Sequence, residues 1–407
     1  MRIVIVHQNP SPLGGPEGIC TLKLIRALVE AGVEVSVVSR EEPHDALRAL
    51  KVDCHPVGRL GPEGRLEKLV RMANLYPEDG WAWAGAASRK IQELCSSGQV
   101  SAICSRAMPF ISHVAAWRAK KNVKVPWIAH FSDPWPPDGY SEGRKHSNLR
   151  LRWHRRVVQR AELVTFPCER VAHFCESTQW GSEGAAKKPQ SLILPHIAGD
   201  FGGLPKSDRG PAGELVFLHC GGFTEKRRPD EFLNAWANFV ERHPENRACL
   251  KFRHVGGMSE RLAKLAEEKG ISDTVEQTGP CSYGESLERM AEASALVLVD
   301  SYKIRASVYF PSKLSDYIGA GKPVLAMTPQ DGTVADLLGK TYHLRADPWD
   351  VPMMSEVLDR AFEHLRGNRL DSLGALQALQ KQCAGPAVAQ RLIQCIEGLM
   401  LRPRTDS

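Results

Sequence analysis

Short apolar runs alternate along the whole chain with longer segments whose apolar residues recur at helical spacing. In the first half the runs occupy 2–7, 34–39, 101–104, 126–131, 163–166 and 191–195. In the second half they occupy 214–222, 248–257, 274–279, 295–300 and 323–327. Continuous apolar runs of this length are typical of buried parallel strands, and the alternation with helices is the α/β pattern. The clearest helix is expected at 18–32, ending on a glycine cap.

One segment interrupts this alternation, because residues 199–214 contain five glycines and two prolines. Such a composition predicts a linker between two domains. We therefore expect two doubly wound, Rossmann-like domains: residues 1–198 and 214–385, joined by a linker at 199–213. A last helix within 386–407 is expected to return toward the first domain. At 407 residues the chain is long enough for two such cores.

The segment 311–325, PSKLSDYIGAGKPVL, carries the strongest chemical signal. It follows the apolar run 295–300, and Pro311 and Ser312 indicate a helix start, with the Ser312 hydroxyl available to cap backbone N–H groups. A helix N-terminus favours an anion. Lys313 in the first turn opposes its own helix dipole, which suggests an external anion. Asp316 could accept bonds from hydroxyl groups of the same ligand, although a capped surface helix remains the alternative.

A second cationic turn follows the run that opens the second half. There Gly222 precedes three successive cations, Lys226, Arg227 and Arg228, before a proline starts the next helix. Solvation is the usual explanation of a charge run. However, this turn leaves the carboxyl end of a strand, where open α/β sheets bind ligands. Arginine also suits phosphate, because its planar guanidinium binds two oxygens at once.

The turn after the first strand, at 7–18, contains Gly14 and Gly15. Glycines there allow a ligand to approach the backbone closely and tolerate unusual φ angles. The spacing is GGxxG and so lacks the dinucleotide fingerprint GxGxxG. The alternative is an ordinary strand-to-helix turn.

Two segments of the first domain carry candidate acceptor-binding chemistry. His113 lies on a helix after a strand, and His130, Asp133 and Trp135 lie at the end of the next strand. Imidazole can transfer protons near neutrality, a carboxylate can bind a sugar hydroxyl, and an aromatic ring can stack on a sugar face. A lone histidine is more often structural. The run HFSDPWP, which holds both His130 and Asp133, resembles the D-x-W-P segment of a subset of sugar transferases. This resemblance makes Asp133 the stronger of the two catalytic candidates in the first domain; Arg227 and Lys313 are the catalytic candidates in the second.

A predicted helix at 143–162 carries five arginines: Arg150, Arg152, Arg155, Arg156 and Arg160. Trp153, Val157 and Ala161 form its apolar stripe. The arginines could simply be a solvated face, or they could attract anionic lipid headgroups or a lipid-diphosphate acceptor. Nucleic acid is not expected as a partner, since no matching basic stripe with aromatics recurs in the chain.

Composition narrows the class further. The chain is 43% apolar and 25% charged with a net charge of +6, as in an ordinary globular protein, and lacks a run long enough to span a bilayer. Eleven cysteines without a CxxC pair, and a start directly in a strand, predict a cytoplasmic protein with reduced thiols. Contact at the inner face of the membrane would be peripheral. No metal-ligand spacing is present, so no metal and no cofactor are expected.

The segment 311–325 resembles the donor motif of GT-B glycosyltransferases, particularly retaining glycosyltransferase family four, with its SK-L-x-E-Y-x-x-x-G-K-P-V pattern. The glycine turn, the cationic turn and the residues 279–299 also resemble that family, and the likeness covers nearly the whole chain. It implies two domains facing across a cleft. It also implies a nucleotide-diphospho-sugar donor, with Lys313 and Arg227 on the phosphates, Asp316 on the ribose and Tyr283 near the base.

One departure from the family is plain, because many members carry two glutamates eight positions apart. Here Val308 occupies the first position and Asp316 the second. The resemblance implies a retaining, metal-independent sugar transfer to a sugar, lipid-linked or small-molecule acceptor, as in cell-surface polysaccharide or glycoconjugate synthesis. A non-hydrolysing sugar-nucleotide epimerase and a non-catalytic nucleotide-sugar-binding protein remain alternatives.

Overall fold

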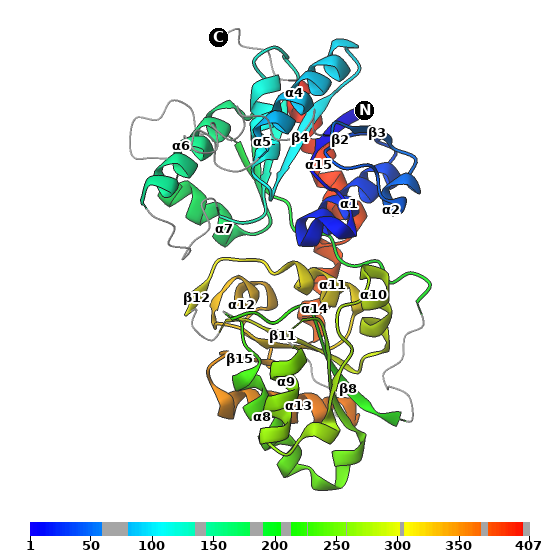
Figure 1. Ribbon diagram of the computed structural model, residues 1–407, viewed down its shortest axis with the longest axis vertical. Coiled ribbons are helices and arrows are strands. Elements are labelled where there is room, and N and C mark those ends of the chain that lie inside the picture. The colour runs from blue at the N-terminus through cyan, green and yellow to red at the C-terminus, as the bar shows by residue number, and fades with distance from the viewer. Residues whose placement is uncertain are drawn as a thin grey trace. The chain divides into compact units, whose positions relative to one another are not determined.

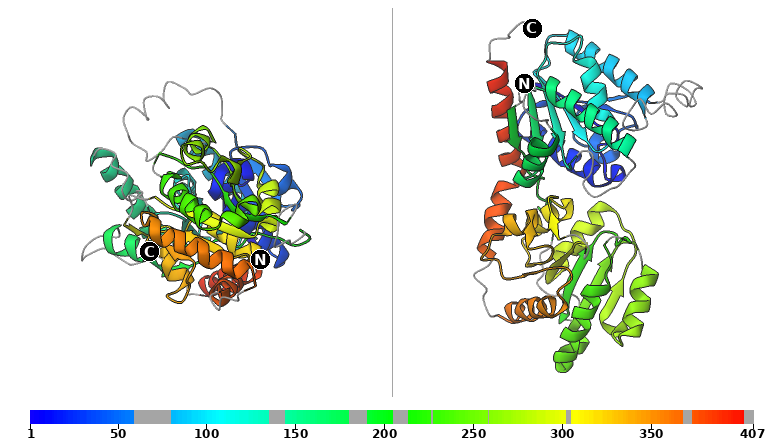
Figure 2. Two further views of the ribbon diagram at one scale, coloured as in Figure 1. Left: turned by 90° about the horizontal axis from the view of Figure 1, so that it is seen from below. Right: turned by 90° about the vertical axis from the view of Figure 1, so that its left-hand side faces the viewer.

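The computed structural model describes residues 1–58, 80–134, 144–179, 190–204, 213–225, 227–257, 259–301, 305–367 and 373–401. The chain divides into two compact units, Met1–Ile197 with Gly385–Ser407, and Ala198–Ala384. The segment expected to be a linker therefore starts inside the second unit, where Gly199 packs closely on Asp316 and Gly319. The last helix belongs to the first unit. Figures 1 and 2 show both units.

The first unit is built on a seven-stranded parallel sheet in the order β3-β2-β1-β4-β5-β6-β7. Its strands are β1 (Arg2–Val6), β2 (Glu34–Ser39), β3 (Asp53–Pro56), β4 (Ala102–Ala107), β5 (Trp127–Phe131), β6 (Leu163–Phe166) and β7 (Gln190–Ile193). Its helices are α1 (Gly15–Glu30), α2 (Asp45–Arg48), α4 (Trp81–Ser96), α5 (Ile111–Ala119), α6 (Arg144–Arg160), α7 (Glu169–Phe174) and α15 (Gly385–Met400). Short turns of helix occupy Pro12–Gly14 and Cys175–Gln179.

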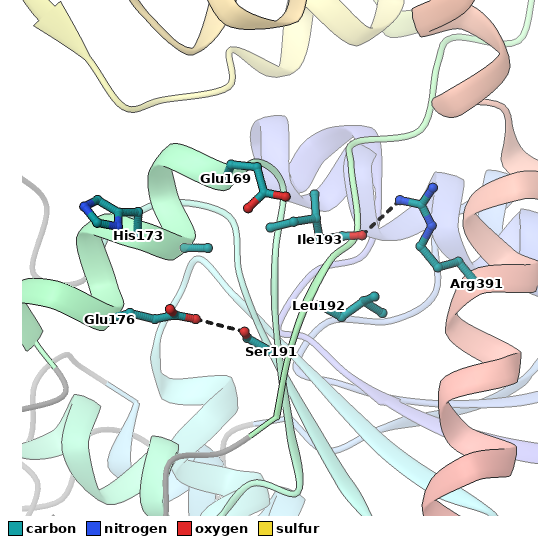
Figure 3. A pocket seen from close by; sticks show the side chains of 8 residues that line it. Glu169, His173, Glu176, Ser191, Leu192, Ile193 and Arg391 are labelled. Carbon is teal, nitrogen blue, oxygen red and sulfur yellow. Dashed lines mark hydrogen bonds between the residues drawn. The ribbon is translucent and has the colours of Figure 1, made fainter.

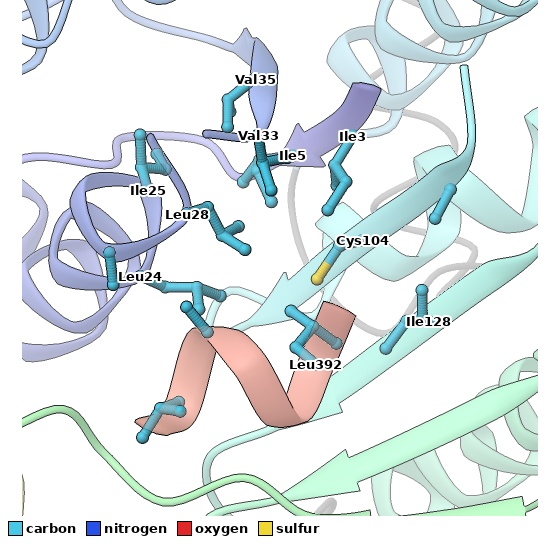
Figure 4. Packing of buried hydrophobic residues seen from close by; sticks show 14 of the residues in the cluster. Ile3, Ile5, Leu24, Ile25, Leu28, Val33, Val35, Cys104, Ile128 and Leu392 are labelled. Carbon is cyan, nitrogen blue, oxygen red and sulfur yellow. The ribbon is translucent and has the colours of Figure 1, made fainter. Parts of the chain in front are cut away.

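A continuous apolar core joins α1 and α15 to one face of this sheet (Figure 4). Ile3 and Ile5 alternate along β1, so both point into this core, while Leu28 of α1 and Leu392 of α15 meet them there. Successive strand residues point to opposite faces, and α5 packs against β1 and β4 on the other side of the sheet. Helices thus cover both faces, which leaves the carboxyl edge of the strands for chemistry.

The second unit repeats this plan with a six-stranded parallel sheet in the order β10-β9-β8-β11-β13-β15. Its strands are β8 (Leu215–Cys220), β9 (Leu250–Val255), β10 (Val275–Gln277), β11 (Ala295–Val299), β13 (Val324–Met327) and β15 (Arg345–Ala346), with β12 (Ala306–Ser307) paired to β14 (Asp331–Gly332). Its helices are α8 (Asp230–Arg242), α9 (Ser259–Glu268), α10 (Tyr283–Glu292), α11 (Ser312–Ala320), α12 (Thr333–Leu338), α13 (Val351–Leu365) and α14 (Leu373–Gln382). Short helical turns occupy Pro244–Cys249 and Ser272–Thr274.

The expectation of two doubly wound α/β sheets is confirmed. In each sheet the strand order reverses between two neighbours, β1 and β4 in the first and β8 and β11 in the second. Open α/β sheets bind ligands beyond the carboxyl ends of strands at this reversal. The residues that follow these four strands are therefore the place to look for a site.

Candidate functional site

Lys313 and Arg227 gather at the strand reversal of the second sheet. The Arg227 guanidinium lies 3.4 Å from Asp300 Oδ1, directly after β11, and the charges of both residues act on the Lys313 amine. Burial and the nearby Arg227 cation lower the pKa of Lys313 to about 8. Two cations held this close together repel each other, so an anion between them would be stabilised.

A short turn between Thr224 and Arg227 positions the Arg227 side chain near Lys313 and Asp300. Thr224 and Arg227 exchange backbone hydrogen bonds at 3.0 Å in both directions, and the Thr224 hydroxyl accepts a further bond from the Arg227 N–H. Of the other two cations in the run, Arg228 donates to the carboxylate of Glu225 at 2.8 Å, and Lys226 lies outside the described residues. Arg227 Nε is buried and finds no hydrogen-bond partner among the described residues. A buried donor without a partner is costly, which favours an acceptor from a ligand.

Glycines let Lys313 reach this position. Gly221 has a φ of +111°, and a Cβ there would lie 2.9 Å from Lys313 Nζ. Gly256, at a φ of +152°, packs equally closely on the backbone of Gly221 and Gly222. The ends of β8 and β9 are therefore pressed together, and the lysine amine passes over the bare backbone. Gly222 itself is exposed.

Helix α11 begins at Ser312, with Pro311 at the N-cap position. The expectation that the Ser312 hydroxyl caps the helix is wrong, because no side chain caps α11 within the described residues. The Pro311 carbonyl instead accepts from Leu314 N–H at 2.9 Å. Backbone N–H groups of the first turn thus point outward without a side-chain partner, as an anion-binding helix start requires.

Asp316 and Tyr283, which the sequence assigned to ribose and base, contact each other. The Tyr283 hydroxyl donates to Asp316 Oδ1 at 2.8 Å. Asp316 is 7% exposed, and Gly199 packs against it so closely that a Cβ there would lie 2.9 Å from Oδ1. The carboxylate is thus fixed in orientation by two neighbours, and a ribose hydroxyl would share it with Tyr283.

A buried ion pair that the sequence did not suggest lies at the strand reversal of the first sheet. Arg106 of β4 contacts Glu17 of α1 at 2.8 Å, and their side chains are only 4% and 10% exposed. Arg106 also donates to Thr21, and the Ser132 hydroxyl, directly after β5, donates to Glu17. Burial raises the pKa of Glu17 to about 7, although Arg106 opposes the shift. Glu17 therefore ties α1 to the ends of two strands.

The hydrogen bond from Ser132 to Glu17 also positions Asp133, which is the next residue after Ser132. Asp133 is half-buried, and burial raises the pKa of its carboxyl group. It stays close enough to Glu17 for its charge to raise the pKa of that residue further. The two carboxyl groups thus lie together beyond the carboxyl edge of the first sheet. Trp135 lies outside the described residues.

The two candidate histidines of the first unit are buried. His113 is 0% exposed, hydrogen-bonded to the Ser105 hydroxyl at 2.8 Å and packed on Phe131. His130 is 1% exposed and hydrogen-bonded to Thr165 at 2.9 Å. Burial lowers the pKa of His113 to about 3 and that of His130 well below its usual range. Their burial favours the structural role that the sequence left open.

Gly14 and Gly15 serve the turn itself. A Cβ on Gly14 would overlap the carbonyl oxygen of Asn9, and Gly15 has a φ of +70°. The glycine pair therefore lets the start of α1 pack on the preceding loop, which carries the buried Ser11. This requirement is independent of any ligand.

A separate cavity of about 510 Å³ lies in the first unit between α7, β7 and α15 (Figure 3). Its polar walls carry Glu169, His173 and Glu176 on one side and Arg391 on the other. The inward groups are already engaged in part, since Ser191 donates to Glu176 and Arg391 donates to the Ile193 carbonyl. None of the residues predicted from the sequence lines it.

Sequence comparisons find similarity to glycosyltransferases. Residues 15–181 match the glycosyl transferase 4-like domain. A D-inositol 3-phosphate glycosyltransferase from Nocardiopsis dassonvillei is 24% identical over 369 residues, covering 80% of this chain and 78% of the relative. A protein with the same description from Streptomyces bingchenggensis is 29% identical over 158 residues, 34% of each chain.

Solved structures show the same fold at low identity. HepE from Anabaena, in complex with UDP and glucose, has a TM-score of 0.67 and 15% identity over 98% of this chain and 99% of its own. Sucrose-phosphate synthase from Thermosynechococcus elongatus has a TM-score of 0.67 and 14% identity over the same shares. The chain therefore shares the GT-B fold of these glycosyltransferases, and the match of residues 15–181 to the glycosyl transferase 4-like domain supports a transferase activity.

Three further findings concern membrane helices, metal sites and cysteines. No helix in the described part of the chain is long and apolar enough to cross a membrane. Among the described residues, no three His, Cys, Asp or Glu side chains are grouped as a metal site. All eleven cysteines are free thiols.

Proposed function

We propose that this glycosyltransferase transfers a sugar from a nucleotide-diphospho-sugar, whose diphosphate is held by Arg227, Lys313 and the start of α11. The observation that carries the proposal is the buried, unpartnered Arg227 Nε beside a half-buried Lys313 amine. Both lie at the strand reversal where such sheets bind ligands. HepE, which shares the fold, was solved with UDP and glucose, so UDP is the first nucleotide to test.

Charge that develops on the leaving diphosphate would be stabilised by these cations and by the backbone N–H groups of α11. The chain then needs no metal at this place. We propose retention of the anomeric configuration, because the resemblance to family four implies it. The leaving phosphate would help to deprotonate the acceptor on the same face of the sugar. Nuclear magnetic resonance of the new linkage would distinguish retention from inversion.

The acceptor is proposed to bind at the carboxyl edge of the first sheet, near Asp133 and Glu17. The curated relatives are named for D-inositol 3-phosphate, which makes a small phosphorylated acceptor the first to test. A lipid-linked acceptor at an anionic membrane is the alternative, supported by the arginines of α6. On that helix the predicted stripe Trp153, Val157 and Ala161 is buried, at 3%, 0% and 7% exposure. Arg152, Arg155, Arg156 and Arg160 are exposed.

A thermal-shift panel tests donor binding. UDP-, GDP-, ADP- and dTDP-sugars are compared with CMP-sugars, which lack a diphosphate and serve as the matched control. A ligand at a hundred times its Kd stabilises the folded protein by about 2.7 kcal/mol. We expect at least one diphospho-sugar to raise the unfolding temperature and CMP-sugars to leave it unchanged. Equal shifts for both classes, or none at all, would contradict the diphosphate site.

A further inference from the structure

Behind the Lys313 amine, two buried histidines continue the hydrogen-bonding of the site into the sheet. His219 is the last residue but one of β8 and His254 is the last but one of β9, and the two are direct partners in the parallel register of these strands. Lys313 Nζ lies 3.3 Å from His219 Nε2. The two Nδ1 atoms lie 3.0 Å apart, and His254 Nε2 lies 3.0 Å from the Gly257 carbonyl oxygen. The Lys313 amine, the two imidazoles and the Gly257 carbonyl thus form one unbranched series of hydrogen bonds.

Lys313 at one end of this hydrogen-bonded series and Gly257 at the other require the same positions for the ring protons of His219 and His254. A carbonyl oxygen only accepts, so His254 Nε2 must carry a proton and donate it to Gly257. An ammonium group only donates, so His219 Nε2 must be bare and accept from Lys313. If both rings are neutral, His219 Nδ1 carries the remaining proton and donates it to the bare Nδ1 of His254. Every nitrogen is then satisfied by one set of tautomers.

The surroundings keep both rings neutral and in place. Both side chains are 0% exposed, and burial is the largest cause that lowers the pKa of each imidazole, with the Lys313 cation adding to it. Phe223 stacks on His219 with ring centroids 4.3 Å apart and planes at 7°. The same ring contacts His254 at 4.7 Å. The rings therefore have little freedom to turn away from Lys313.

We propose that His219 and His254 are positioning residues, which act as a neutral two-imidazole relay anchored on Gly257 and hold the Lys313 ammonium at the diphosphate site. The inference rests on the proposed function of Lys313 as a phosphate-binding cation. Among the described residues no carboxylate forms an ion pair with Lys313, and Asp300 lies next to Arg227 instead. A neutral acceptor orients the amine without neutralising the charge that the diphosphate needs.

Every hydrogen bond in the relay is donated in the same direction, from Lys313 toward Gly257. A proton added to the bare Nδ1 of His254 would therefore be incompatible with this arrangement. Protonation of His254 at Nδ1 would place two N–H groups face to face between the rings. His219 would then have to accept there and carry its proton on Nε2, against the Lys313 ammonium. The charged groups that act on the relay are Lys313 and Arg227, with Cys220 and Asp300 also acting on the Lys313 amine. We expect donor affinity to fall as pH drops below the ordinary imidazole range, where the rings take up protons.

Nuclear magnetic resonance of the full-length protein labelled with ¹⁵N-histidine tests the tautomers without any ligand. The spectrum should show His219 protonated at Nδ1 and His254 protonated at Nε2, with both rings neutral at pH 7. His219→Phe and His254→Phe provide the assignments. The opposite tautomer of His219, or a charged ring at pH 7, would overturn the relay whatever the donor site proves to be.

Calorimetry with UDP, and with inorganic pyrophosphate as a probe that carries no base, tests the function. His219→Phe keeps the stack on Phe223 but removes both ring nitrogens. It should weaken UDP binding roughly fivefold, as expected for the loss of one neutral hydrogen bond. Lys313→Ala should weaken it about tenfold or more. His343→Phe, the same change at an exposed histidine of this unit, is the control and should bind like wild type.

The double variant separates positioning from general damage. If His219 acts only through Lys313, adding His219→Phe to Lys313→Ala should weaken binding by no more than about twofold further. Independent, additive losses would contradict the positioning role, as would unchanged UDP binding in His219→Phe when Lys313→Ala binds poorly. Unchanged binding in Lys313→Ala would instead overturn the proposed donor site, while the tautomers would still report on the relay.

Discussion

The Tyr283 hydroxyl donates a hydrogen bond to the Asp316 carboxylate at 2.8 Å and so joins the first residue of α10 to the second turn of α11. Tyr283 is the first residue of α10, whose start is fixed by a capping box between Ser282 and Glu285. The tyrosine thus comes from a rigid helix start. This bond gives Asp316 a fixed orientation at the proposed ribose position before any nucleotide binds.

Asp316→Asn should weaken the binding of a nucleoside diphosphate, because a ribose hydroxyl loses its charged acceptor. Bonds to charged groups contribute about 1.5–3 kcal/mol, so we expect a loss of roughly tenfold or more. Tyr283→Phe leaves the carboxylate in place and should cause a smaller loss. Calorimetry with UDP measures both. Wild-type affinity in Asp316→Asn would make Asp316 a structural residue of α11.

Donor affinity should fall as pH rises through about 8. The pKa of Lys313 is lowered to about 8, and only the ammonium form attracts the diphosphate. Affinity should therefore be complete between the ordinary imidazole range and about pH 8, and should decline above pH 8 by at most about tenfold per pH unit. Lys313→Met should bind more weakly and lose this alkaline decline. The same decline in Lys313→Met would assign it to another group.

Glu17→Ala should destabilise the first unit strongly, because it leaves the Arg106 guanidinium buried without its partner. Breaking a buried ion pair by removing one member costs about 3–5 kcal/mol. Replacing both members, as Glu17→Met with Arg106→Met, should recover much of this loss. Differential scanning calorimetry of the full chain measures the unfolding of each variant. If the double variant is as unstable as the single one, the unpaired charge is not the cause.

The arginines of α6 should bring the protein to anionic membranes if its acceptor is lipid-linked. Arg156 lies over the Trp153 ring at 4.9 Å and Arg160 over the Trp117 ring at 5.4 Å, so these exposed arginines pack on the indole rings beneath them. Sedimentation with liposomes should increase with anionic lipid and fall as salt rises, since charges are screened beyond about 8 Å at physiological ionic strength. Replacing Arg152, Arg155 and Arg156 with Gln should abolish binding without slowing donor hydrolysis. Binding that ignores lipid charge would favour a soluble acceptor.

The sequence predicted that Lys313 and Arg227 would lie close together, and the structure places them so for a physical reason. Lys313 and Arg227 each follow a buried strand in a parallel sheet, so their convergence is a consequence of the topology. Their spacing of nearly ninety residues does not matter to that argument. The predicted Ser312 cap failed because Pro311 already occupies the N-cap position.

Two features could not be predicted from the sequence, because each depends on contacts between segments that are distant along the chain. Glu17 and Arg106 carry no motif, and only the packing of α1 against β4 makes them a buried pair. The histidine relay did leave a signal, since H-x-G-G occurs twice, at 219–222 and 254–257. Each copy spans the end of a strand, but only the observed pairing of β8 with β9 places the two histidines side by side.

The central claim is tested most directly by the release of nucleoside diphosphate from UDP-, GDP-, ADP- and dTDP-sugars, followed by chromatography. Arg360→Ala, a largely exposed arginine paired with Glu356, is the matched control for Arg227→Ala. The account predicts that wild type and the control turn over at least one donor, and that Arg227→Ala releases its nucleotide at least about tenfold more slowly. Equal release by Arg227→Ala, or no release from any donor, would contradict it.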